Sequence, residues 1–187
     1  NNVLLLSGGD EFQGSLFYTT YKSEVVADFM NELGFDATAT GNHEFDDGPE
    51  ELAAFVDRAD FPILAGNFDV SNEPLLAGKM EDYVVLEIDG EKVGVIGALT
   101  VDTVDISSPG GNITFEDPAE FAAGAVEELE AMGVNKIIMV SHLGYNEDQR
   151  VAAAAPGIDV IVGGHSNTRL SNDDDGADGP YPTMVGD

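Results

Sequence analysis

The hexapeptide Gly41-Asn42-His43-Glu44-Phe45-Asp46 sets the organisation of the whole chain. It follows an apolar run that predicts a strand, and it precedes a stretch that predicts a helix. It also holds one of the three histidines in 187 residues. The other two, His142 and His165, also come directly after strand-like apolar runs. Three histidines in the same local position predict that the fold brings them together with nearby carboxylates.

Strands and helices alternate along the chain, which predicts an α/β fold with helices packed on a sheet. Ser23 is the predicted N-cap of the first helix, and Gly34 is predicted to end it. Two alternating runs around Asp89-Gly90-Glu91 predict a hairpin. The predicted strands cover residues 3–7, 36–40, 61–65, 83–88, 92–97, 136–140, 158–162 and 181–185, and the predicted helices cover 24–33, 117–132, 147–155 and a segment that begins at Gly48-Pro49.

The charge balance excludes several partners. Thirty-six acidic residues face seven basic ones, for a net charge of −29. Such a surface repels nucleic-acid phosphates and anionic membranes, so we expect no polymer nucleic acid as a partner. No apolar run approaches the roughly 20 residues that span a bilayer. The chain begins within a strand-like run and has no signal-peptide pattern, which suggests that the natural protein starts further upstream.

The acidic excess and the scarcity of lysine favour adaptation to molar salt, as in a halophilic organism, over an ordinary acidic protein. Because dilute buffer screens this charge poorly, we expect partial unfolding at low ionic strength. Thermal melts between dilute buffer and molar KCl test this expectation. A melting temperature that does not change with salt would contradict it.

Ligand-type side chains follow four separate strand-like runs. They are Asp10, the pair Asn42-His43, His142 and His165. Residues at the carboxyl ends of strands in an open α/β sheet meet at one edge, so we expect these side chains to converge. A lone histidine is more often a structural residue, but three in this placement are much less easily explained by chance. With no cysteine in the chain, any metal must bind oxygen and imidazole ligands.

The motifs resemble those of a known family. Gly9-Asp10 with Gln13-Gly14, the hexapeptide 41–46, Ser141-His142-Leu143-Gly144 and Gly163-Gly164-His165-Ser166 are similar in order and spacing to the 5′-nucleotidase branch of the calcineurin-like metallophosphoesterases. That branch includes 2′,3′-cyclic nucleotide phosphodiesterases. The resemblance implies a four-layer α/β/β/α sandwich with two divalent metal ions at its rim, and hydrolysis of phosphate esters, chiefly nucleotides, by a metal-activated hydroxide.

The resemblance also implies a role for each site residue. Asp10 would bridge the two metals, and Asn42, His142 and His165 would complete the second metal site. Asn167 stands where the family places a histidine or glutamine ligand of the first metal. The catalytic residues would be His43, which stabilises the transferring phosphoryl group, and Asp46, which orients it; we expect structural roles for Glu44 and Phe45. This ligand set suits Zn²⁺, Mn²⁺, Co²⁺ or Fe.

The chain departs from the family pattern upstream of Asp10. The Asp-x-His motif of the family's first strand is absent from residues 1–9, so we expect two metals in the intact site and one here. Residues 1–187 are expected to form part of one catalytic domain, without that first strand and without the C-terminal substrate domain. Family members are often exported or held at the cell surface.

Two alternatives to an active enzyme stay open. In the first, the chain is a metal-deficient or inactive fragment that acts only as a binding or structural module. In the second, it is an unrelated nucleotide-binding α/β domain. The second is the weaker one, because the sequence contains neither a Gly-x-Gly-x-x-Gly pattern nor a Walker loop.

Overall fold

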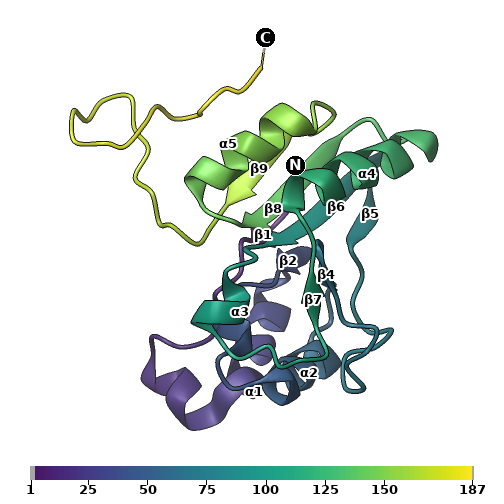
Figure 1. The fold of residues 1–187 in the computed structure, drawn as a ribbon, viewed down its shortest axis with the longest axis vertical. Helices are drawn as coiled ribbons and strands as arrows, with labels where there is room; N and C mark the ends of the chain where they lie inside the picture. Colours follow the sequence, from purple (N-terminus) through teal and green to yellow (C-terminus); the bar gives the residue numbers. More distant parts are fainter. Residues whose placement is uncertain (1–2, 187) are drawn as a thin grey trace.

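A computed structural model describes residues 3–186 of the chain. The first half builds a parallel sheet with strand order β1-β2-β3. Two helices pack on the outer side of this sheet (Figure 1). The elements are β1 (Leu6–Ser7), α1 (Leu16–Leu33), β2 (Ala37–Ala39), the short 3-10 helix η1 (His43–Phe45), α2 (Pro49–Arg58) and β3 (Ile63–Leu64).

The second half builds a mixed sheet with strand order β5-β6-β8-β9. Strands β5 and β6 form the predicted antiparallel hairpin, with Asp89 and Gly90 at positive φ in its turn. Strands β6, β8 and β9 run parallel to one another. The elements are β4 (Phe68–Asp69), β5 (Tyr83–Ile88), β6 (Glu91–Leu99), α3 (Thr103–Ile106), β7 (Thr114–Phe115), α4 (Pro118–Ala131), β8 (Ile137–His142), α5 (Tyr145–Ala154) and β9 (Val160–Gly163).

Three apolar clusters hold the layers together. The middle cluster joins the inner faces of the two sheets, where small side chains such as Ala37 and Ala39 meet Val95 and Val140. A second cluster packs α1 and α2 on the first sheet, and a third packs α4 and α5 on the second. The order helices, sheet, sheet, helices is visible from bottom to top in Figure 1. The predicted four-layer α/β/β/α sandwich is therefore confirmed.

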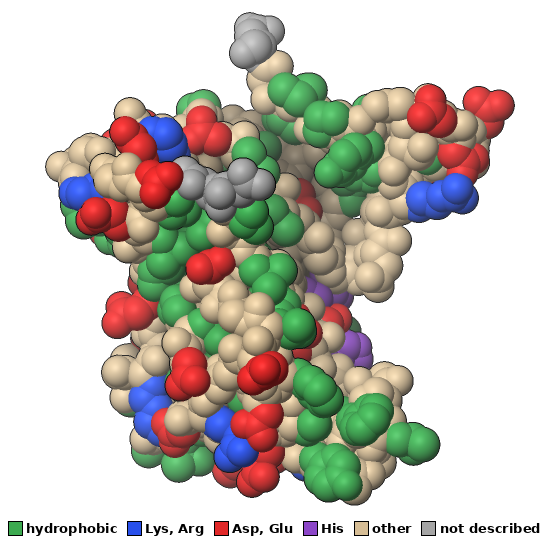
Figure 2. All heavy atoms as spheres, turned by 180° about the vertical axis from the view of Figure 1, so that it is seen from behind, with side chains coloured by type: hydrophobic (Ala, Val, Ile, Leu, Met, Phe, Trp, Pro, Cys, Tyr) green, Lys and Arg blue, Asp and Glu red, His purple; other side chains and the backbone are tan. Residues whose placement is uncertain are grey.

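The two sheets place their strand ends at one rim. Leu99 at the end of β6 pairs with His142 at the end of β8, and Ser141 pairs with Gly163 at the end of β9. The loops after β1 and β2 touch there too, because a Cβ added to Gly9 would lie 2.4 Å from the nitrogen of Gly41. Figure 2 shows histidine side chains at the waist of the molecule, between its upper and lower halves.

The first helix begins earlier than predicted. It starts at Leu16, where Ser15 is the N-cap and accepts a hydrogen bond from the Tyr18 N–H. Its backbone breaks at Lys22, whose φ is 56°, and the predicted cap Ser23 lies directly after this break. Ser23 is buried, and its backbone N–H and its hydroxyl both donate to the Glu51 carboxylate of α2. Its side chain therefore does not cap the start of a helix. Gly34 ends the helix in the left-handed conformation, as predicted.

Two smaller predictions need correction. Residues 181–185 form no strand, although a single bridge joins Leu170 to Gly179 nearby. Helix α5 begins at Tyr145, two residues before the predicted start. Among the described residues, no helix is both long and apolar enough to cross a membrane.

Candidate metal centre and catalytic histidine

Four predicted metal ligands converge at the rim. His142 Nε2 lies 3.1 Å from Asp10 Oδ2 and 3.2 Å from Asn42 Oδ1. The same Asn42 oxygen lies 3.0 Å from Nδ1 of His165. Ligand atoms of Asp10, His142 and His165 all fall within 4.8 Å of one another. Strands β1, β2, β8 and β9 each deliver one of these side chains through the loop or residue at their carboxyl end.

This arrangement fits one divalent cation. His142 Nδ1 lies 2.5 Å from the carbonyl oxygen of Gly8, so Nδ1 is the protonated nitrogen and donates to that oxygen. When the His142 ring is neutral, its Nε2 is therefore a hydrogen-bond acceptor. This nitrogen faces two more acceptors, Oδ2 of Asp10 and Oδ1 of Asn42. Acceptors can converge in this way around a shared proton or around a cation. Bonds of about 2.1 Å to a tetrahedral cation separate neighbouring ligand atoms by roughly 3.4 Å. The contacts of 3.0–3.2 Å between these side chains are slightly shorter, so small shifts of the side chains would admit the ion.

The contact between Asp10 and His142 shifts the pKa values of both side chains in this cluster. Burial raises the pKa of Asp10, but the hydrogen bond with His142 and the His43 N–H outweigh it, and the net effect is a lowered pKa. Burial lowers the pKa of His142, but the contacts with Asp10 outweigh it and raise that pKa above its ordinary value. Burial and the neighbouring His142 lower the pKa of His165. A metal ion would take the place of the proton that Asp10 and His142 share.

The predicted catalytic pair lies next to this cluster. His43 Nδ1 is 2.6 Å from Oδ2 of Asp46, and the His43 side chain is 46% exposed. The hydrogen bond with Asp46 raises the pKa of His43. The backbone N–H of His43 donates to Asp10 Oδ1 at 3.0 Å, which ties the pair to the metal cluster. The ring therefore remains accessible from solvent while its Nδ1 is held.

Glu44 organises the loops that carry the ligands. Its side chain is only 1% exposed, and its carboxylate accepts hydrogen bonds from four backbone N–H groups. Oε1 accepts from Glu11 and Phe12, and Oε2 accepts from Asp10 and Gly41. This one carboxylate thus joins the Asp10 loop to the hexapeptide.

Backbone geometry at the rim is unusual. Asp10, His165 and Asn167 all have positive φ, at 64°, 67° and 48°. Non-glycine residues adopt this conformation rarely, and it concentrates at functional sites. Gly41 cannot be replaced by a larger residue, because a Cβ there would lie 2.3 Å from the nitrogen of Asp10 and 2.4 Å from its Oδ1.

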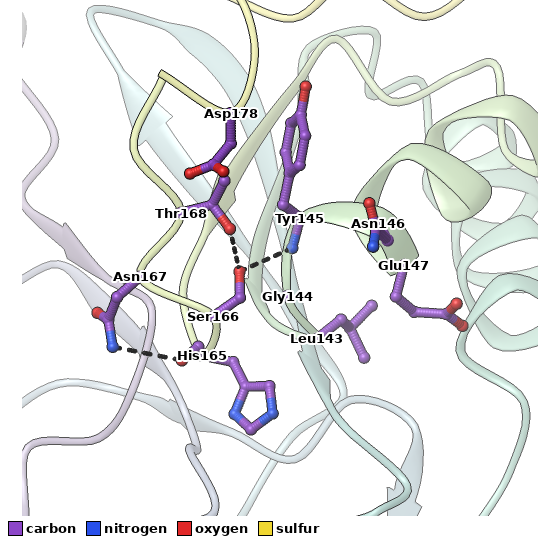
Figure 3. Close-up of a pocket in the computed structure, with 10 residues that line it drawn as sticks. All are labelled: Leu143, Gly144, Tyr145, Asn146, Glu147, His165, Ser166, Asn167, Thr168 and Asp178. Atoms are coloured by element: carbon purple, nitrogen blue, oxygen red, sulfur yellow. Dashed lines mark hydrogen bonds between the residues drawn. The ribbon is translucent and has the colours of Figure 1, made fainter. Parts of the chain in front are cut away.

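Asn167 lies apart from the four converging ligands. Its side chain extends away from the His165 ring, and its Nδ2 donates at 3.4 Å to the His165 carbonyl oxygen (Figure 3). It lines a cavity of about 680 Å³ between the start of α5 and the loop after β9. Ser166 also lines this cavity. Its hydroxyl accepts a hydrogen bond from the Tyr145 N–H and forms another with the Thr168 hydroxyl.

Two polar residues that support the site were not predicted. Ser107 donates a hydrogen bond to Asp46, and Asp148 accepts one from Ser141, which precedes His142. The Asp148 carboxylate also packs against Gly163, where a Cβ would meet it at 2.4 Å. Asp148 therefore contacts β8, which ends in His142, and β9, which ends two residues before His165. Ser107 has no local signal, because its contact joins segments 61 residues apart. Asp148 is only seven residues after Ser141, but its place in the first turn of α5 does not by itself indicate that contact.

Asp148 should make stability depend on pH. Burial raises its pKa to about 6 in the folded chain, above the unfolded value of about 3.9. The folded state therefore holds this proton more tightly, and ionisation costs stability as pH rises from roughly 4 to 6. Asp148→Asn keeps the shape and an oxygen acceptor for Ser141 but removes the charge. Its stability relative to the parent chain should grow by about 3 kcal/mol over that pH range and then level off.

Denaturant unfolding in molar KCl across this pH range measures the effect. Asp175→Asn is the control, because Asp175 is exposed and its substitution should leave the pH profile unchanged. A constant difference between Asp148→Asn and the parent chain at every pH would show that Asp148 ionises normally.

Comparisons with known proteins agree with this geometry. The calcineurin-like phosphoesterase family model matches residues 1–168. The 5′-nucleotidase precursor of Thermus thermophilus is 47% identical with a TM-score of 0.94, over 99% of this chain and 37% of that one. The 5′-nucleotidase of Rattus norvegicus is 44% identical over 90% of this chain and 30% of its own length. The NAD nucleotidase of Haemophilus influenzae is 36% identical with a TM-score of 0.85, over 91% of this chain and 34% of that one.

This chain thus spans about a third of the length of these relatives. The family match covers far more than half of the chain, and two of the relatives exceed 40% identity. The chain therefore belongs to the calcineurin-like phosphoesterase family.

Proposed function

We propose that this chain is the catalytic part of a metal-dependent phosphoesterase that hydrolyses nucleotides, of the 5′-nucleotidase or 2′,3′-cyclic phosphodiesterase type. The observation that carries the proposal is the convergence of Asp10, Asn42, His142 and His165 beside the His43–Asp46 pair. The nucleotide substrate class rests on the relatives, which are named 5′-nucleotidases.

In this proposal Asp10, Asn42, His142 and His165 hold a divalent metal ion. When bound, such an ion supplies positive charge for the phosphoryl oxygens and lowers the pKa of water for attack. This local charge is needed because the chain as a whole carries −29 and would repel an anionic ester. Zn²⁺, Mn²⁺, Co²⁺ and Fe all suit the donor set.

His43 is the proposed proton donor to the leaving oxygen, and it stabilises the negative charge that develops on the phosphoryl oxygens. Asp46 holds Nδ1, so Nε2 is the nitrogen that faces a substrate. The hydrogen bond with Asp46 raises the pKa of His43, which keeps the ring protonated to higher pH. A protonated ring stabilises the phosphoryl oxygens and can donate its proton to the leaving oxygen. The His43 contribution should therefore be present at low and neutral pH and be lost as pH rises through the folded pKa.

A binding module without turnover is the second candidate. The observation that favours it is Asn167, the proposed ligand of a first metal, which bonds to the His165 carbonyl instead of joining the ligand cluster. Among residues 3–186, Asp10, His142 and His165 form the group of acidic and histidine side chains gathered closely enough for an ion. One metal per chain and no turnover would be the expected behaviour of such a module.

Phosphate release from 5′-AMP and from p-nitrophenyl phosphate separates the two candidates. The assay uses the chain in molar KCl after chelation and reloading with Mn²⁺ or Co²⁺, and calorimetry counts the bound ions. We expect metal-dependent release that His142→Ala abolishes by removing a ligand. No release with any of the metals, from a chain that binds one ion or none, would reject the enzyme in favour of the module.

A further inference from the structure

Ser107 lies in the irregular segment after β6, far from the motifs of the site. It directly follows α3 and is half-buried, and its hydroxyl donates to Oδ1 of Asp46 at 2.8 Å across 61 residues of sequence. The other Asp46 oxygen, Oδ2, is the one that contacts His43 Nδ1 at 2.6 Å. Each carboxylate oxygen of Asp46 therefore has its own partner, and rotation of the carboxylate would break both contacts.

The segment that carries Ser107 is itself well anchored. The Ser107 N–H donates to the carbonyl of Thr103, which is fully buried. Thr103 Oγ1 donates in turn to the carbonyl of Thr100 at 2.7 Å. The Thr100 N–H donates to the carbonyl of His142 at 3.0 Å. A short chain of hydrogen bonds thus runs from a residue of the metal cluster to the carboxylate that holds His43.

We propose that Ser107 is a positioning residue that fixes the Asp46 carboxylate, and through it the His43 imidazole, relative to the metal ligands. This inference rests on the proposed function, because it assigns a purpose to the orientation of His43. The alternative is a surface hydrogen bond that stabilises α3 and has no effect on His43. Such a bond would contribute to folding alone and would leave the orientation of the ring to Asp46.

The test uses a matched pair of variants, Ser107→Thr and Ser107→Val. Their side chains have the same shape, and the extended backbone of Ser107, with φ of −143°, accepts a β-branched residue. They differ in the hydroxyl, so any effect of shape or folding appears in both. Ser108→Ala is the control, because Ser108 is exposed and adjacent.

Two measurements are made on the whole chain. The first is kcat and KM for p-nitrophenyl phosphate with Mn²⁺. We expect Ser107→Val to lower kcat about tenfold, as for one lost hydrogen bond to a charged group, with KM changed less than about twofold. Ser107→Thr and Ser108→Ala should stay near the parent kcat. Equal kcat in the Thr and Val variants would overturn the proposal.

The second measurement is NMR of isotope-labelled histidine with Zn²⁺, at one fixed pH above the folded pKa of His43, where the neutral ring has a tautomer to observe. It needs no turnover. The parent chain and Ser107→Thr should show His43 with its proton fixed on Nδ1. Ser107→Val should show a mixture of tautomers or a broadened signal. An unchanged His43 signal in Ser107→Val would overturn the positioning role. If the parent chain hydrolyses no ester, the proposed function fails, and the NMR comparison still decides whether Ser107 positions His43.

Discussion

Replacing His43 with alanine should lower kcat for phosphate-ester hydrolysis by roughly a hundredfold to ten-thousandfold, the usual contribution of a positioned acid or base. Asp46 contacts this ring and raises its pKa, so removal of the ring takes away a positive charge beside the predicted metal ligands that would stabilise the phosphoryl oxygens. Steady-state kinetics with metal-loaded protein measure the loss. Asp46→Asn should cause a smaller loss, because it keeps the ring and weakens its orientation.

Metal binding should survive this substitution almost unchanged. The contact of His43 with the cluster is made by its backbone N–H, which donates to Asp10 and remains in alanine. His165→Ala is the matched control, because its ring nitrogen lies 3.0 Å from Asn42 Oδ1 within the ligand set. Calorimetric titration should find parent-like metal affinity in His43→Ala and a severe loss in His165→Ala. Loss of the metal from His43→Ala would mean that the ring is a ligand and not the proposed catalyst.

The sandwich could be predicted because local patterns and fold rules agree in this chain. Apolar runs alternate with helical periodicity, and four of these runs are followed by a ligand-type residue. Parallel strands put such ends at one rim, so Asp10, Asn42, His142 and His165 could be expected together from the sequence. The structure does bring these four together. Their roles as ligands remain proposals.

The start of α1 shows where local patterns fail. Residues 16–21 carry Leu16, Phe17 and Tyr21, which are largely exposed, while Tyr18 is buried. This segment is held by tertiary contacts: the Tyr18 ring packs on Phe12, and its hydroxyl donates to Asp47. Apolar periodicity needs several side chains on one buried face, and residues 16–21 bury only Tyr18. The periodic pattern therefore begins beyond the break at Lys22.

Ser107 and Asp148 were missed for a different reason. Each acts through a hydrogen bond to a residue beside the site, at Asp46 and at Ser141. Sequence spacing predicts which side chains share an element face. It does not show how an irregular segment crosses another loop, as for Ser107, or that a side chain in the first turn of a helix contacts the preceding strand, as for Asp148. Ser107 is 61 residues from Asp46, and its position depends on how the residues after β6 turn through α3.

Glu44→Gln should destabilise the chain by roughly 3–6 kcal/mol, a large part of the 5–15 kcal/mol that holds a typical domain folded. The carboxylate accepts four backbone N–H groups, two on each oxygen. In either orientation a glutamine amide can accept two of them, and its NH₂ group then faces the other two donors. Burial raises the pKa of Glu44, so the charge itself is costly to bury, and glutamine removes that cost. Two unpaired buried donors outweigh this gain.

The same substitution should weaken metal binding, because the lost hydrogen bonds hold Asp10 and Gly41 together at the rim. Denaturant unfolding and metal titration in molar KCl measure the two effects. Glu50→Gln is the control: this exposed residue lies near the start of α2, and its substitution should change stability by less than about 0.5 kcal/mol. If Glu44→Gln unfolds at the parent denaturant concentration and binds metal equally well, the two loops are held by other contacts. The pairing of Gly9 with Gly41 would then be the next contact to test, since their backbones leave no room for a Cβ on either residue.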